Sequence, residues 1–220
     1  MRTKFQYKII ILLVVGLFCI GLTGLKAQTV KDIDGNVYNT ETIGTQIWIA
    51  ENLKTTKYND GTAIPLVAED AAWGALTTPG YCWYNKDATT NKSTYGALYN
   101  WYTVNTNKLC PKGWHVSADA EWTIITSYLG GEGVAGGKLK ETGTTHWEKP
   151  NNEATDQTGF TTLPGGYRNN HGAFANSGFF GFWWSSTESV ATAAWCRTIG
   201  CAGNDVLRIF SLKKNGYSVR

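Results

Sequence analysis

The sequence predicts a mixed α+β fold with short strands, few helices and long loops. Short apolar runs are separated by many Gly, Asn and Thr residues, which argues against a helical bundle. Ten tryptophans argue against disorder, because disordered chains are usually poor in aromatic residues. Residues 28–220 have a length that suits one domain.

Residues 1–27 have the order of a secretory signal peptide. Basic residues open the segment, an apolar run from Ile9 to Leu25 follows, and Ala27 is a small residue at a plausible cleavage point. The alternative is an uncleaved anchor, but glycines interrupt the run and it falls short of the roughly 20 apolar residues that span a bilayer. We therefore expect an exported protein, secreted or held at the cell surface, with the periplasm or outer membrane as alternatives.

The charge of residues 28–220 argues against nucleic-acid binding. The whole chain carries 20 basic and 17 acidic residues, but four of the basic ones lie in the first 27 positions. The remaining 16 basic and 17 acidic residues leave a net charge of −1 and no basic stripe. The electrostatic pattern of a nucleic-acid-binding protein is missing. We expect no nucleic-acid partner, and contact with a membrane only through export or surface attachment.

The first third of the mature chain predicts hairpins. Asp34-Gly35 lies between short apolar runs, and Asp-Gly favours a two-residue hairpin turn. A calcium loop is the alternative, but its twelfth position, which should be a carboxylate, is Ile43. A second strand pair is expected over 42–49, and an aromatic strand over 81–84.

Two helices are expected in the middle of the chain. Apolar residues at helical spacing predict a short helix over 95–104. The main helix follows Ser117, the expected N-cap. Its residues Trp122, Ile125 and Leu129 recur at i, i+3 and i+7, which predicts one buried face.

Gly131-x-Gly133-x-x-Gly136 formally matches a dinucleotide-binding fingerprint. That fingerprint must follow a strand and open a helix, whereas this segment follows a helix. We therefore predict a helix exit and a flexible turn here, with a weak helical turn over 138–141 and no nucleotide cofactor.

The last third is expected to consist of strands and loops. Candidate strands lie over 182–186, 194–199, 206–210 and 217–219.

Two features of this last third are candidate ligand-binding sites. Trp183 and Trp184 are adjacent, so in a strand they face opposite ways, and one could be an exposed binding anchor. Packing of both in the core is the alternative. The polar turn Arg168, Asn169, Asn170 and His171 could present hydrogen-bonding groups to a sugar, or it could be a solvated hairpin tip.

No catalytic set stands out. The three histidines, His115, His146 and His171, are scattered, and no zinc-protease, nucleophile-elbow or P-loop motif occurs. His115 lies in a strand-like run, where we expect a structural role. The sequence thus predicts no enzyme, no metal and no cofactor.

Four cysteines follow the predicted signal peptide, and an exported protein can form disulfides. Three full pairings of Cys82, Cys110, Cys196 and Cys201 are possible. In one extended strand Cys196 and Cys201 would lie roughly 16 Å apart, against the roughly 5.5 Å that a disulfide requires. These two can pair only if the chain turns between them.

Several blocks, in order, resemble the Fibrobacter succinogenes major paralogous domain (FISUMP). The resemblance covers nearly the whole mature chain, and it implies an exported or surface protein of Bacteroidota-like bacteria with no established activity. The blocks are Asp34–Tyr38, Ile43–Trp48, Ala50–Lys54, Tyr95–Trp101, Cys110–His115, Leu163–Arg168, Trp184–Glu188 and Gly216–Arg220.

A more distant similarity links Gly113–Trp122, Pro164–Arg168 and Gly216–Arg220 to formylglycine-generating and sulfatase-modifying enzymes. It implies a C-type-lectin-like fold, with two main helices, a short twisted antiparallel sheet and long loops. In that fold the two chain ends pair in one sheet.

The resemblance also bears on the cysteines. FISUMP domains commonly continue past Ser-Val-Arg into a cysteine, the expected partner of Cys110, whereas this sequence stops at Arg220 and so looks truncated. Cys110 is then either free or paired with Cys82. Cys196 and Cys201 have the spacing of the copper-binding pair of aerobic formylglycine-generating enzymes, although their flanking residues do not match.

These observations lead to one preferred hypothesis and two alternatives. We expect a non-catalytic binding or adhesion module at the cell surface, whose partner is an extracellular glycan or protein. The first alternative is a sulfatase-modifying-type oxidase that uses Cys196 and Cys201. The second is a structural component of the cell surface.

Overall fold

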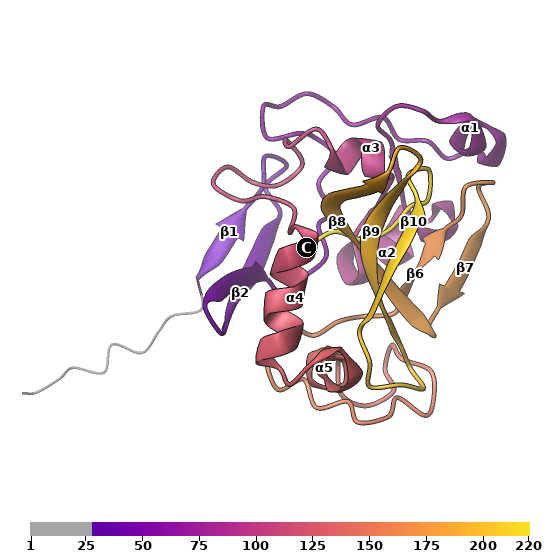
Figure 1. The fold of residues 1–220 in the computed structure, drawn as a ribbon. Coiled ribbons are helices and arrows are strands. Elements are labelled where there is room, and N and C mark those ends of the chain that lie inside the picture. The colour runs from indigo at the N-terminus through magenta and orange to yellow at the C-terminus, as the bar shows by residue number, and fades with distance from the viewer. Residues whose placement is uncertain (1–27) are drawn as a thin grey trace, which may run out of the picture.

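The computed structural model describes residues 28–220, so the predicted signal peptide at 1–27 lies outside the described residues. The described part combines three small β-sheets with short helices (Figure 1), which confirms the α+β class. None of the helices in 28–220 is both long enough and apolar enough to cross a membrane. In chain order the elements are β1 (Thr29–Lys31), β2 (Val37–Ile43), β3 (Gln46–Ile49), α1 (Asp70–Ala75), β4 (Tyr81–Cys82), the 3₁₀ turn η1 (Tyr84–Lys86), α2 (Ala88–Tyr95), β5 (Leu98–Tyr99), α3 (Trp101–Val104), α4 (Asp119–Tyr128), α5 (Glu132–Leu139), β6 (Gly165–Arg168), β7 (Phe174–Ser177), β8 (Phe180–Val190), β9 (Ala193–Gly200) and β10 (Leu207–Leu212).

The N-terminal sheet has the order β1-β2-β3, with antiparallel neighbours. Both predicted hairpins are confirmed, although the first turn spans residues 32–36 and is not the two-residue turn that Asp-Gly favours. In the first turn Gly35 has a φ of 86°, a backbone conformation that glycine adopts without strain. The Asp32 carboxylate accepts hydrogen bonds from the Asn36 amide (2.8 Å) and the Tyr38 hydroxyl (2.7 Å). These bonds explain an acidic residue there without a calcium ion.

The main sheet has the order β10-β9-β8-β6-β7. Strands β8, β9 and β10 are antiparallel, whereas β6 lies parallel to β8. The final segment adds short bridges, from Tyr217 to Tyr99 and from Ser218 to Trp183. The strands predicted over 182–186, 194–199 and 206–210 are therefore confirmed, with β8 and β9 longer than expected, whereas 217–219 makes only isolated bridges.

Strand β8 separates two aromatic clusters of the core. Trp184 packs with Tyr99, Trp101 and Tyr217 on one side, and its ring lies 4.5 Å from that of Tyr217. Trp183 belongs to the other cluster. Both indoles are fully buried. The alternation of a strand thus sends the two neighbours to opposite sides, as predicted.

Helix α4 joins the N-terminal sheet to the main sheet. Trp122, Ile125 and Leu129 are buried, which confirms the predicted apolar face. The Trp122 ring lies 5.0 Å from that of Trp48 in β3 and 6.4 Å from that of Trp183 in β8. Figure 1 shows α4 between β1–β2 and the strands β8–β10.

The helix predicted over 95–104 is confirmed only over Trp101–Val104. Helix α2 ends at Tyr95, and Gly96 breaks the helical path with a φ of 73°. Residues 98–99 then pair with β4, and a new helix begins only after Asn100, whose side chain accepts a hydrogen bond from the Thr103 amide. Apolar spacing alone does not detect this interruption.

The flexible turn predicted at Gly131-x-Gly133-x-x-Gly136 is also wrong, because α5 runs through it. Two glycines of this helix allow close packing. A Cβ added to Gly136 would lie 2.7 Å from the Asn204 carbonyl oxygen, and one added to Gly137 would lie 2.6 Å from that of Glu153.

Candidate functional site

A groove of 440 Å³ opens between β3, the 113–117 segment and the start of α4. Small-molecule sites have volumes of roughly 300–1,000 Å³. Apolar side chains form much of its wall: Trp48 is buried, Trp114 is half-buried, and Ile47 is 53% exposed. The polar residues that line the groove include Gln46, His115, Ser117, Glu121 and Arg220.

The 110–117 segment is held by its backbone. The Trp114 amide donates a hydrogen bond to the Pro111 carbonyl (3.0 Å), and Gly113 supplies the positive φ of 86° that this turn requires. The Asn59 side chain donates to the Cys110 carbonyl, and the Ser186 amide donates to the Ser117 carbonyl (2.9 Å). The segment is therefore anchored at both ends, which fixes the groove wall.

Ser117 does not cap helix α4, contrary to the prediction. The N-cap is Ala118. The Ala118 amide donates to the Glu121 carboxylate (2.7 Å), and the Asp119 amide donates to Thr187 Oγ1 in β8 (3.0 Å). Ser117 is only 6% exposed, and no described residue hydrogen-bonds to its hydroxyl. The groove is thus lined by a residue with an unsatisfied hydroxyl.

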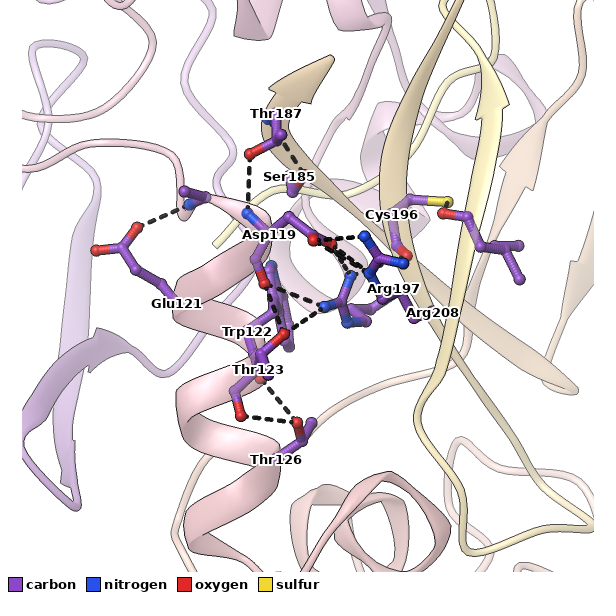
Figure 2. A network of polar contacts seen from close by, with 12 residues as sticks. Asp119, Glu121, Trp122, Thr123, Thr126, Ser185, Thr187, Cys196, Arg197 and Arg208 are labelled. Carbon is purple, nitrogen blue, oxygen red and sulfur yellow. Dashed lines mark hydrogen bonds and ion pairs between the residues drawn. The ribbon is translucent and has the colours of Figure 1, made fainter. Parts of the chain in front are cut away.

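The start of α4 is tied to the main sheet by Asp119 (Figure 2). Its carboxylate accepts hydrogen bonds from Arg197 Nη1 of β9 (2.6 Å) and from Arg208 Nη2 of β10 (2.9 Å). Burial raises the pKa of this carboxyl, but the hydrogen bonds from Arg208 and Arg197 outweigh that effect and hold the pKa below its ordinary value. In Figure 2, Glu121 leaves the helix on the other side, so the arginines fix Asp119 and do not contact Glu121.

His115 and Glu121 meet at the rim of the groove. His115 Nε2 lies 2.9 Å from the Glu121 carboxylate, and the ring is 72% exposed. Ser117, His115 and Glu121 are the residue types of a hydrolase triad. However, Ser117 Oγ lacks the hydrogen bond to a histidine that activates a nucleophile. His115 and Glu121 therefore pair at the rim, and Ser117 Oγ is not joined to them in an assembled triad.

The Arg220 guanidinium is turned into the protein. It donates to Asn52 Oδ1 (2.9 Å), to the Phe160 carbonyl, and to the Thr161 carbonyl (2.9 Å). Burial lowers its pKa to about 9, so it stays protonated at neutral pH. These three acceptors hold the guanidinium inside the protein, so each of its three nitrogens already donates to a protein group.

Arg168, a predicted ligand-binding residue, is instead structural. It is fully buried, with its guanidinium carbon 4.7 Å from the Trp73 ring and 4.8 Å from the Phe174 ring. It donates to the Val67 carbonyl (2.6 Å) and to the Asp70 carboxylate (2.7 Å). A side chain with these contacts ties the 67–70 segment to β6 and does not reach a ligand.

The other residues of that polar turn form the tip of the β6–β7 hairpin, which confirms the hairpin interpretation. Asn169 Oδ1 accepts hydrogen bonds from the His171 and Ala173 amides (2.9 and 3.0 Å). The Asn170 side chain lies 3.2 Å from His171 Nε2. None of these described residues lines the groove, so a binding role for Asn169, Asn170 and His171 stays a prediction.

Trp183 and Trp184 do not form an exposed anchor. Besides being fully buried, each indole has a partner for its N–H: Asn52 Oδ1 for Trp183 (2.8 Å) and the Tyr99 carbonyl for Trp184 (2.9 Å). Their place among the ligand-binding residues is corrected, and the alternative, that both pack in the core, is confirmed.

Of the two alternatives for Cys110, the structure has the free thiol, and no Cys82–Cys110 disulfide is formed. All four described cysteines are buried and free. Cys82 packs with Trp73 and Leu98, whereas Cys110 belongs to a different cluster. Cys196 and Cys201 likewise lie in separate clusters. Burial raises the pKa of Cys82, Cys110 and Cys196 to about 12.

The groove residues were missed by the reasoning from sequence. The sequence predicts a structural His115 and a capping Ser117, and Trp48 and Trp114 occur there only within the blocks that resemble the family. A turn that carries a tryptophan beside a glycine, Gly113-Trp114, was the available signal, because a large aromatic side chain next to a tight turn is hard to bury fully.

The comparisons with known proteins agree with the predicted resemblance. The family model described as the Fibrobacter succinogenes major domain matches residues 42–220. The match includes every residue that lines the groove. No curated protein and no solved structure gives a significant match. Because the matched residues make up well over half of the chain, the protein belongs to the Fibrobacter succinogenes major domain family.

Proposed function

We propose that the protein is an exported or cell-surface, non-catalytic binding module that holds its ligand in the groove beside Ser117. The observation that carries this proposal is that Ser117, whose buried hydroxyl has no partner among the described residues, lines the groove. A buried polar group without a partner costs about 1–3 kcal/mol. A ligand that supplies a partner would recover part of that free energy on binding.

The arrangement of the groove favours binding over catalysis. Its titratable rim groups, His115 and Glu121, contact each other, and the Ser117 hydroxyl contacts neither. The backbone anchors of the 110–117 segment and the arginine contacts of Asp119 hold these groups in place. A rigid, preformed wall suits ligand binding, because less conformational entropy is lost on association.

Export and the finer fold assignment belong to the same proposal. The pattern of residues 1–27 supports export to the cell surface or beyond it. A C-type-lectin-like fold is supported by a contact of the C-terminal segment with the first third of the described chain, although β1–β3 form a separate sheet. The Leu53 amide, soon after β3, donates a hydrogen bond to the Val219 carbonyl (2.9 Å).

A binding screen tests the proposal. Purified protein would be applied to arrays of glycans and of extracellular proteins, alongside Trp114→Ala and the control Phe210→Ala. Phe210 is 63% exposed but does not line the groove. We expect binding that Trp114→Ala weakens and Phe210→Ala retains. No binding to either array, or binding that Trp114→Ala leaves unchanged, would refute the proposal.

A further inference from the structure

We infer that the groove binds a neutral saccharide unit, recognised by Trp114 and by a set of uncharged donors and acceptors. This inference rests on the proposed function and specifies its ligand. Three features of the groove lead to it: its apolar walls, the chemistry of its polar groups, and the way its charged groups are already engaged.

The apolar walls suit a ring with one hydrocarbon face. Trp48 comes from β3 and Trp114 from the 110–117 segment, and both line the groove. Trp48 Nε1 donates to Gln46 Oε1 (3.2 Å), so this indole is held by its neighbour in the strand. Indoles offer large apolar surfaces with few rotatable bonds. Trp48 is only 5% exposed, so the half-buried Trp114 offers the larger accessible surface, on which the C–H face of a pyranose ring can pack.

The free polar groups match hydroxyls. The bond from Trp48 engages the oxygen of the Gln46 side chain and leaves its amide nitrogen free to donate, since no described residue accepts from that nitrogen. The Ser117 hydroxyl can both donate and accept, and no described group uses it. A sugar hydroxyl also donates and accepts, so one ligand group can serve either residue.

The charges of the groove disfavour an anionic ligand. The Arg220 guanidinium is engaged by Asn52, Phe160 and Thr161, and it is the only Lys or Arg among the described residues that line the groove. The Glu121 carboxylate contacts His115 and the Ala118 amide. A phosphate, sulfate or carboxylate would lose its hydration without gaining a free cation, which is unfavourable.

Isothermal titration calorimetry with defined oligomers tests the inference. The neutral probes are cellotetraose, xylotetraose, mannotetraose and maltotetraose. The contrasting probes are tetragalacturonate, which is anionic, and an uncharged alanine tetrapeptide. We expect at least one neutral tetrasaccharide to bind, and Trp114→Ala to raise its Kd about tenfold or more. Ser117→Ala should raise the Kd between about twofold and tenfold, whereas Phe210→Ala should leave it unchanged.

The outcomes separate this inference from the proposed function. Groove-dependent binding of tetragalacturonate or of the peptide, without binding of any neutral probe, would overturn the saccharide assignment and leave a binding module. Neutral binding that neither groove variant weakens would overturn the groove as its site. If none of the four neutral probes binds, the inference is also overturned. Groove-dependent binding on the protein array would then still preserve the proposed function. Circular dichroism would establish that each variant is folded; if Trp114→Ala is not, Ser117→Ala decides.

Discussion

Replacing Asp119 with Ala should destabilise the protein by about 3 kcal/mol, because it leaves a buried arginine without its carboxylate. Arg197 is fully buried. Its Nη1 would lose the 2.6 Å contact to Asp119 and keep only the Cys196 carbonyl at 3.4 Å. Its Nη2 would keep the backbone carbonyl of residue 119 and Thr123 Oγ1.

The magnitude follows from this count of partners. Removal of one member of a buried ion pair costs about 3–5 kcal/mol, and the contacts that Nη2 retains place Asp119→Ala at the lower end. Arg208 is 37% exposed, so Arg208→Gln should cost less than about 1 kcal/mol. Urea unfolding at neutral pH measures both. A loss below about 1 kcal/mol for a folded Asp119→Ala protein would refute the reasoning.

The same contact predicts a dependence on pH. The folded-state pKa of Asp119 is lowered from an ordinary value of 3.8. Its contribution is therefore fully present above the unfolded-state pKa and is lost as the pH falls through 3.8 toward the folded-state pKa. The stability difference between wild type and Asp119→Ala should shrink in this acidic range. A difference that stays constant down to pH 2 would argue against the carboxylate as its source.

Three further predictions concern the scaffold. Gly136→Ala should lower the free energy of unfolding in urea by about 2–3 kcal/mol, because the added Cβ would meet a backbone carbonyl. Gly133→Ala, in the same helix but with open space around it, should instead raise it by about 0.5–1 kcal/mol. Equal effects of the two substitutions would contradict this packing. Lys140→Met should lower the free energy of unfolding by about 3 kcal/mol, because the carbonyls of Asn152 and Gly203 would each lose the hydrogen bond of 2.8 Å that Lys140 Nζ donates. A variant as stable as wild type would disprove this role of Lys140. Cys82, Cys110 and Cys196 should react with Ellman's reagent only as fast as the protein unfolds, because they are buried and their thiolates are disfavoured. Rapid labelling of these thiols in the native protein would contradict their burial.

Local signals in the sequence were enough to predict several elements. The first hairpin follows from Asp34-Gly35, because the turn depends on residues adjacent in the chain. Helix α4 follows from Trp122, Ile125 and Leu129, whose spacing marks one face. The alternation of β8 follows from the adjacent Trp183 and Trp184, but the sequence alone did not show that both indoles are buried.

The candidate site depends on long-range contacts, so it could not be predicted in the same way. Ser117 looks like an N-cap, but Thr187 and Glu121 supply the oxygens at the start of α4. Thr187 lies on another strand, and the sequence gives no sign that it would replace the expected cap. Likewise, Trp48 and Trp114 are far apart in the chain and meet only when β3 and the 110–117 segment pack together.

Two-dimensional NMR of the tryptophan indole N–H groups, recorded with increasing amounts of the tightest-binding tetrasaccharide, tests the central claim most directly. Trp48 and Trp114 line the groove, whereas the half-buried Trp195 packs against Phe210 and Arg208 on β10, outside it. If the groove is the binding site, the signals of Trp48 and Trp114 shift and saturate together while that of Trp195 stays in place. A saturating shift of Trp195, with Trp48 and Trp114 unchanged, would contradict the account.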